Sequence, residues 1–165
     1  MAYTYNVKVF GAEEIEQAFK QAPQIARKEL GKALKDSALA IEAQTKPRTP
    51  VNFGQLRNSM SASGGAIDGP SFQGNNIRVS YGSNVKYAPF MELGTRPHFP
   101  PRDALKNWAR YKLGNESLWF LVARKIARSG TKPRYFLRDG YRAAKGHIES
   151  FIKLSLGSIT KQLAK

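Results

Sequence analysis

The chain has 165 residues, of which 41% are hydrophobic and 24% charged, and it contains no cysteine. This balance suits one soluble domain with one hydrophobic core, and it excludes a disordered chain, a membrane-spanning protein and any cysteine chemistry. Lysine and arginine number 27 against 12 acidic residues, so the net charge of +15 requires a polyanion, an acidic partner or an anionic surface to compensate it. No segment approaches the roughly 20 apolar residues that cross a bilayer, and residues 1–10 lack the apolar block of a signal peptide, so we expect neither a membrane partner nor secretion.

The first predicted elements are a strand and a divided helix. Residues 3–9 alternate between apolar and polar side chains, which is the period of a strand with one buried face. After that strand, apolar or small residues recur every three or four positions, which predicts an amphipathic helix. Pro23 divides it into a short helix and a longer one that runs to Gln44, and the prolines of Lys46–Pro50 end the second helix.

The middle of the chain predicts short elements joined by turns. Leu56–Ser63 begins as a helical turn and ends as a strand, and Ile77–Tyr81 is a strand with alternate residues on one face. Between them, Gly64–Asn76 is rich in glycine and asparagine, which predicts a flexible hairpin connection or a protruding loop. Tyr87–Leu93 fits a short helical turn that Gly94 closes.

Three helices are predicted in the last third of the chain. Arg102–Leu113 and Glu116–Ser129 form a helical hairpin around Gly114-Asn115, where glycine ends one helix and asparagine caps the next. The last helix covers Asp139–Gln162. We therefore predict a single α+β domain over the whole chain: a small, mostly antiparallel sheet packed on a long helix, with a helical-hairpin insertion at residues 98–130 and a C-terminal helix.

The positive charge lies in the second half of the chain. Residues 1–45 carry six basic and six acidic residues, whereas Arg96–Lys145 carries 13 basic and three acidic residues, a net charge of +10. Such a segment predicts one positive face that contacts phosphates without reading base sequence, although a solvated helix face has the same composition. The candidate phosphate-facing residues are Arg102, Lys106, Arg110, Arg124, Lys125 and Arg128.

Motifs for catalysis are absent from the sequence. His98 and His147 have no second histidine or carboxylate pair at metal-ligand spacing. The sequence contains no G-x-S-x-G elbow and no phosphate-binding glycine loop. The six acidic residues after position 45 are not clustered as a nuclease metal site would require. We therefore expect no enzyme, no cofactor and no metal.

Three segments stand out together, at residues 49–59, 87–95 and 131–137, and read TPVNFGQLRNS, YAPFMELGT and TKPRYFL. In this order, between a long helix and a terminal helix, they resemble the neck or tail-completion proteins of long-tailed bacteriophages, a family that includes minor tail proteins similar to lambda protein Z. Asn52 and Phe53 depart from the family pattern. The matching positions are Thr49, Pro50, Val51, Gly54, Leu56, Arg57 and Ser59 in the first segment, and Tyr87, Ala88, Glu92, Gly94 and Thr95 in the second.

The matching residues have two interpretations, as formers of the fold or as contacts between subunits. Pro50 and Gly54 are typical of a turn that lets Leu56 enter the core. We expect Glu92 to be exposed or paired, and our hypothesis is an ion pair with an arginine of a neighbouring subunit.

The resemblance implies a structural virion protein of the phage neck, assembled in the host cytoplasm and without enzymatic activity. Its copies would form a ring, a hexamer on a sixfold tail, that completes the tail end and joins it to the DNA-filled head. The implied partners are further copies of the chain, head-completion or connector proteins, and tail terminator or tail tube proteins. Viral double-stranded DNA would be contacted without sequence preference.

A freestanding, sequence-independent nucleic-acid-binding protein is the alternative function. Trp108, Tyr111 and Trp119 lie among the arginines and could stack on bases, although their helical spacing favours burial in a core. Binding of free DNA by a stable monomer would favour this alternative.

Overall fold

The computed structural model describes residues 23–51, 54–62, 65, 67–74 and 76–163. The predicted strand at residues 3–9 and the short helix before Pro23 lie outside the described residues. The helices and strands follow one another as α2 Pro23–Thr45, η1 Lys46–Arg48, α3 Gln55–Ser59, β1 Ser71–Gln73, β2 Asn76–Arg78, α4 Ala88–Leu93, α5 Arg102–Leu113, η3 Glu116–Leu118, α6 Trp119–Ser129 and α7 Phe136–Leu163. The fold is α+β, as predicted.

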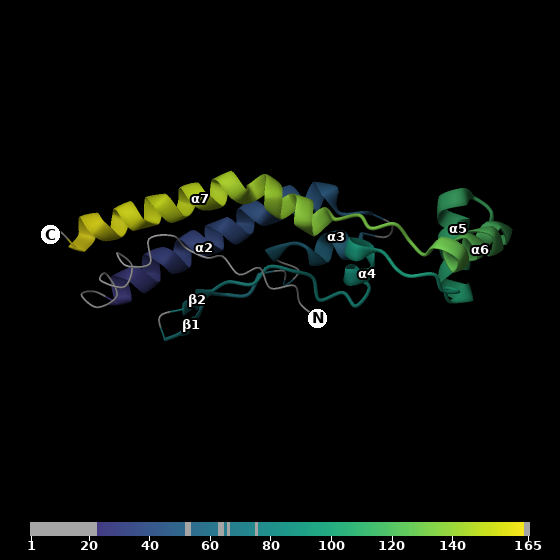
Figure 1. Cartoon of the computed structure of the whole chain (residues 1–165), viewed down its shortest axis with the longest axis horizontal. Helices are drawn as coiled ribbons and strands as arrows, with labels where there is room; N and C mark the ends of the chain where they lie inside the picture. The colour runs from purple at the N-terminus through teal and green to yellow at the C-terminus, as the bar shows by residue number, and fades with distance from the viewer. Residues whose placement is uncertain (1–22, 52–53, 63–64, 66, 75, 164–165) are drawn as a thin grey trace.

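Helices α2 and α7 pack side by side in opposite directions and form an elongated body (Figure 1). Small residues let the two helices approach closely, because a Cβ atom added at Gly140 of α7 would lie only 2.8 Å from the Cα atom of Thr45 in α2. The main core joins both helices to α3, α4 and Tyr81, and a second, smaller core lies further along the helix pair. The buried residues of the main core are Ala38, Ile41, Leu56, Met60, Tyr81, Ala88, Phe136, Leu137, Ala144 and Ile148, and those of the second are Ala26, Leu30 and Ile159.

The described sheet has two antiparallel strands, in which Phe72 of β1 pairs with Ile77 of β2. Two sequence predictions for this region were wrong. The segment after α3 continues as a turn at Met60 rather than as a strand, and β1 lies within the predicted loop Gly64–Asn76. Phe72 is the one apolar residue of β1, so the strand has no alternating pattern for sequence reasoning to detect.

The predicted helical hairpin is confirmed and lies at one end of the molecule, beyond the body (Figure 1). Gly114 takes a left-handed conformation with φ 68° after α5, and the side chain of Asn115 accepts a hydrogen bond from the backbone nitrogen of Ser117 at 2.9 Å. Two extended segments connect the hairpin to the body, and they pair at Thr95 and Thr131.

Candidate functional site

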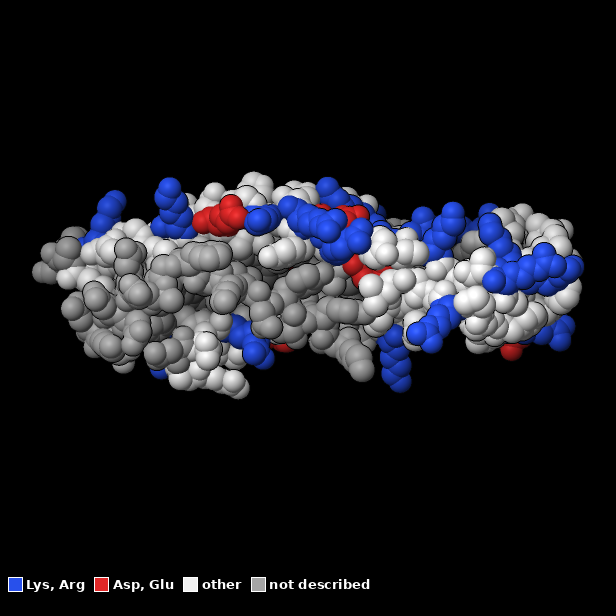
Figure 2. Space-filling view, in the orientation of Figure 1, with Lys and Arg blue, Asp and Glu red and all other residues white. Residues whose placement is uncertain are grey.

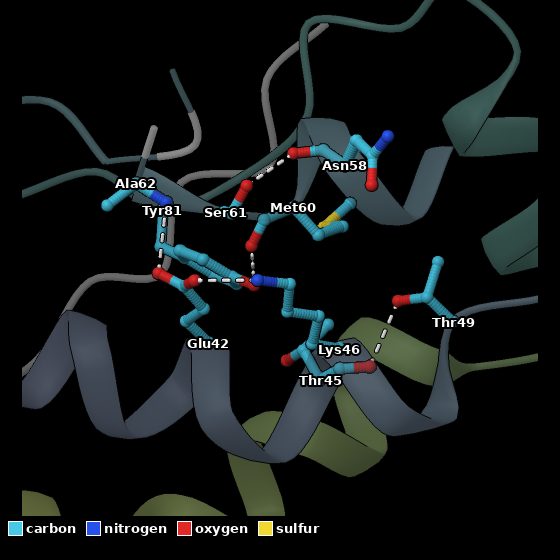
Figure 3. A network of polar contacts seen from close by, with 9 residues as sticks. All are labelled: Glu42, Thr45, Lys46, Thr49, Asn58, Met60, Ser61, Ala62 and Tyr81. Carbon is cyan, nitrogen blue, oxygen red and sulfur yellow. Dashed lines mark hydrogen bonds and ion pairs between the residues drawn. The ribbon is translucent and has the colours of Figure 1, made fainter. Parts of the chain in front are cut away.

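The first matching segment forms a corner between α2 and α3. The hydroxyl of Thr49 is buried and donates a hydrogen bond to the carbonyl oxygen of Thr45 at 2.9 Å, which ties the corner to the end of α2 (Figure 3). Gly54 has φ 80° and turns the chain into α3, where Leu56 enters the core. Ser59 is buried as well, and its hydroxyl lies 2.7 Å from that of Ser83. These four residues make their contacts within the chain, at the corner between α2 and α3.

Other residues of this segment remain exposed. Val51 and Arg57 face solvent, and Pro50 is half-buried. Arg57 lines an open groove of about 560 Å³ between the end of α2 and α3. The groove is lined by Leu39, Glu42, Ala43, Lys46, Pro47, Arg57, Ser61 and Ala62.

Glu42 fixes one wall of this groove (Figure 3). One of its carboxylate oxygens lies 3.5 Å from the ammonium nitrogen of Lys46, and the other accepts a hydrogen bond from the backbone nitrogen of Ala62 at 3.0 Å. Beside this wall, the hydroxyl of Tyr81 donates a hydrogen bond to the carbonyl oxygen of Met60 at 2.9 Å. The pKa of Tyr81 is raised well above the usual tyrosine value, chiefly because burial disfavours the charged tyrosinate.

The second matching segment contains the clearest correction to the sequence predictions. Glu92 is only 5% exposed, and its carboxylate oxygens accept hydrogen bonds from the backbone nitrogens of Leu137 and Arg138, both at 2.9 Å. The carboxylate thus caps the N-terminus of α7, where the helix dipole favours negative charge. Because both oxygens are engaged within the chain, this capping role replaces the exposed carboxylate and the intersubunit ion pair that we expected.

The rest of α4 divides into a buried and an exposed side. Ala88 packs in the main core, whereas Tyr87, Phe90 and Leu93 recur every three residues and are exposed. They form an apolar ridge on the surface of the body. The signal for this ridge is present in the sequence as apolar residues at helical spacing.

The third segment connects the hairpin to α7. Tyr135 has φ 49°, and its carbonyl oxygen accepts a hydrogen bond from the backbone nitrogen of Asp139 at 2.8 Å. The guanidinium of Arg138 lies 3.5 Å from the centre of the Tyr135 ring. This turn places the N–H groups of the first turn of α7 against Glu92, and α7 therefore begins three residues earlier than predicted, at Phe136.

Gly94 and Thr95, the last matching positions, lie at the base of the hairpin. The backbone nitrogen of Thr95 donates to the carbonyl oxygen of Thr131 at 3.1 Å, and the side-chain oxygens of the two threonines are 3.0 Å apart. Gly94 has φ 75°, and a Cβ atom there would collide with the carbonyl oxygen of Thr131. The position therefore requires glycine.

The six candidate phosphate-facing residues do not share one environment. Lys106 and Arg110 lie 3.0 Å and 2.5 Å from the carboxylate of Glu116, and these contacts hold the pKa of Glu116 below its usual value. The contact with Arg110 is the larger cause. On α6, Lys125 and Arg128 are exposed and make no ion pair with a described residue.

Arg102 and Arg124 are held differently, because their guanidiniums lie over the rings of Trp119 and Phe120.

Figure 2 shows lysine and arginine side chains spread along the body and around the α5–α6 end, with uncharged residues between them on this face. The view shows one side of the molecule, so one continuous positive face stays a prediction.

The aromatic residues of the hairpin are only partly buried. Trp108 and Trp119 are half-buried and Tyr111 is exposed, so the expected burial in a core holds for the tryptophans in part. Sequence reasoning missed Phe99, Phe120 and Leu121, which are all exposed. The consecutive apolar residues at 119–123 contained the signal, because a single helix face cannot bury five successive side chains.

Within the described residues, no group of three or more histidine, aspartate or glutamate side chains is placed to hold a metal ion. No helix in the same ranges is both long enough and apolar enough to cross a membrane.

Comparison with known protein families gives a match over the first part of the chain. Residues 13–94 match the family model described as "Bacteriophage HK97-gp10, putative tail-component". The matched residues contain the first two segments that carried the resemblance, but they end before the hairpin. No curated protein and no solved structure matches the chain. A similarity to lambda protein Z is therefore not shown, and the match supports a bacteriophage tail or neck family for this chain.

Proposed function

We propose that the chain is a structural protein of the phage neck that forms a ring of six copies, completes the tail end and joins it to the DNA-filled head. The match of residues 13–94 to a phage tail component is the observation that carries this proposal. The same match supports contacts with other tail or head proteins of the virion. The neighbours that we propose for the ring are head-completion or connector proteins and tail terminator or tail tube proteins.

A closed ring requires that each subunit present two different surfaces, because each interface joins unlike patches. The described residues offer such a pair. One is the groove at the end of α2, which contains the exposed Leu39 beside Pro47. The other is the apolar ridge of α4, formed by Tyr87, Phe90 and Leu93. We assign these two surfaces to opposite sides of the subunit interface.

The oligomeric state tests the ring directly. We expect the purified full chain, alone or mixed with tails that lack it, to give a hexameric mass by native mass spectrometry. Leu39→Glu and Phe90→Glu should each abolish the oligomer, because each buries a charge in an apolar contact. The exposed Leu154 of α7 provides a matched control, and Leu154→Glu should leave the oligomer intact. A monomer under all of these conditions would contradict the ring.

The position in the virion needs a second experiment. A phage that lacks the gene should accumulate filled heads and separate tails, and the purified chain should restore their joining. Density for the chain at the neck in a particle map would locate it. Complete, infectious particles formed without the chain would overturn the proposed function.

The freestanding nucleic-acid-binding protein remains the competing function, and the net charge of +15 favours it. In the neck, exposed cations such as Lys125 and Arg128 would contact DNA only through phosphates. Tight, salt-dependent binding of duplex DNA by a monomer that never associates with tails would support the competing function instead.

A further inference from the structure

The helical hairpin exposes aromatic and apolar side chains that its own small interior does not cover. Phe99, Phe120 and Leu121 are 57%, 47% and 60% exposed. The ring of Trp119 makes edge-to-face contacts with its two neighbours, at 6.4 Å from Phe99 and 5.7 Å from Phe120 between ring centres. These rings form one contiguous aromatic surface on the hairpin.

Two arginines lie over this surface. The guanidinium of Arg102 is 5.4 Å from the centre of the Trp119 ring, and that of Arg124 is 6.0 Å from the centre of the Phe120 ring. Cation–π contact orients a guanidinium while its N–H groups remain able to pair with a carboxylate. We call Phe99, Arg102, Trp119, Phe120 and Arg124 the aromatic–arginine cluster.

The charge around the cluster is strongly positive. Residues 96–130 contain eight basic and two acidic residues, a net charge of +6. One of the two acids, Glu116, is already paired with Lys106 and Arg110. A surface that docks on the hairpin must therefore supply negative charge of its own.

We propose that the aromatic–arginine cluster is the docking surface for a second protein that presents carboxylates around an apolar centre. Aromatic residues and arginine are the residue types that dominate the binding energy of protein interfaces. The apolar area needs a partner that excludes water from it, and the two guanidiniums provide bidentate contacts for carboxylates at its margin. This inference rests on the proposed function in naming the partner as another virion protein.

Two other occupants fit the cluster less well. Nucleic acid would stack its bases on ring faces, but an arginine covers one face of Trp119 and one face of Phe120. A second copy that docked hairpin on hairpin would bring two segments of net charge +6 together, since residues 96–130 carry this charge in each copy. Charge complementarity therefore favours an acidic protein surface over both.

Tryptophan fluorescence of the full chain reports on the hairpin alone, because the two tryptophans, Trp108 and Trp119, both lie in it and Trp119 belongs to the cluster. The probes are a soluble peptide of alternating glutamate and leucine, poly-L-glutamate of equal charge, and a short DNA duplex. We expect the glutamate–leucine peptide to change the emission of Trp119 and to bind at least about tenfold more tightly than poly-L-glutamate.

Variants separate the cluster from general charge. Arg102→Gln with Arg124→Gln, and separately Phe120→Ser with Leu121→Ser, should each weaken peptide binding by about tenfold or more. Lys153→Gln with Lys161→Gln removes the same charge from exposed positions on α7, and it should change binding by less than about twofold. Circular dichroism should show unchanged helix content in all three variants.

Three results would overturn the inference. The first is equal affinity for the glutamate–leucine peptide and for poly-L-glutamate. The second is tighter binding of the DNA duplex than of the peptide. The third is an equal loss of peptide affinity in the cluster variants and in the α7 control. All of these measurements use the isolated chain, so they do not depend on ring formation or on particles. A failure of the ring with intact peptide binding would count against the proposed function alone.

Discussion

The carboxylate of Glu92 accepts a hydrogen bond from the backbone nitrogen of Leu137, 45 residues further along the chain, at 2.9 Å. One side chain thereby fixes the start of α7 against α4 and joins the second matching segment to the third. The carboxylate is buried, so its removal leaves the N–H groups of this helix end without their charged acceptor.

Glu92→Ala should lower the free energy of unfolding by about 2 to 4 kcal/mol, because it leaves two backbone N–H groups at a helix end without their charged acceptor. Urea unfolding followed by circular dichroism at neutral pH measures this change. Glu149→Ala is the matched control, since Glu149 is an exposed glutamate of α7 whose ion pair with Lys145 spans 3.8 Å. That substitution should cost less than about 0.5 kcal/mol, and equal losses in both variants would refute the capping role.

Gly140→Ala should destabilise the protein by about 1 to 3 kcal/mol, because the new Cβ atom would force α2 away from α7 at Thr45. Gly146→Ala on the same helix should do the opposite and stabilise by about 0.5 to 1 kcal/mol, since no atom lies within 4 Å of the added group. Thermal unfolding of the two variants compares them directly. A stabilised Gly140→Ala protein would show that the two helices pack less closely than described.

Tyr81→Phe should lower stability by about 1 to 2 kcal/mol at neutral pH, because the carbonyl oxygen of Met60 loses its donor. The raised pKa of Tyr81 also predicts a pH dependence. The folded state holds the phenol proton more tightly than the unfolded state, so this stability is complete below about pH 10 and declines as the pH rises further. Unfolding free energies measured from neutral to alkaline pH should therefore fall less steeply in Tyr81→Phe than in the wild type. Tyr87→Phe, which alters an exposed tyrosine, should retain the steeper decline.

The pairing of Glu116 should be visible in a carboxyl NMR titration. Its pKa lies below the usual glutamate value because of Arg110 first and Lys106 second. The ion pairs therefore favour the folded hairpin above the usual value and lose their contribution as the pH falls through the lowered pKa. Arg110→Gln should raise the titration midpoint of Glu116 more than Lys106→Gln does. A midpoint that neither variant moves would contradict the pairing.

Local signals explain which elements could be predicted from the sequence. Helix α5 was predicted with its observed bounds, because Pro101 precedes it and Gly114 ends it. The cap at Asn115 is likewise a contact between near neighbours in the sequence. Such signals need no knowledge of the tertiary fold.

Long-range contacts explain what could not be predicted. The position of Glu92 depends on a turn at Tyr135 that brings the N–H groups of α7 to it, and no pattern around residue 92 contains that information. In the candidate site, the basic residues of α5 could be listed from the sequence, but the pairing of Lys106 and Arg110 with Glu116 depends on how the turn after α5 brings η3 back against that helix. The ring and its neighbours remain predictions.

The pairing of Thr95 with Thr131 brings together the two points where the hairpin leaves and rejoins the body. A tight turn grafted between these threonines would close the chain without moving α4 or α7, and a different module could be inserted at the same place. The hairpin is thus a cassette that can be exchanged while the scaffold is retained.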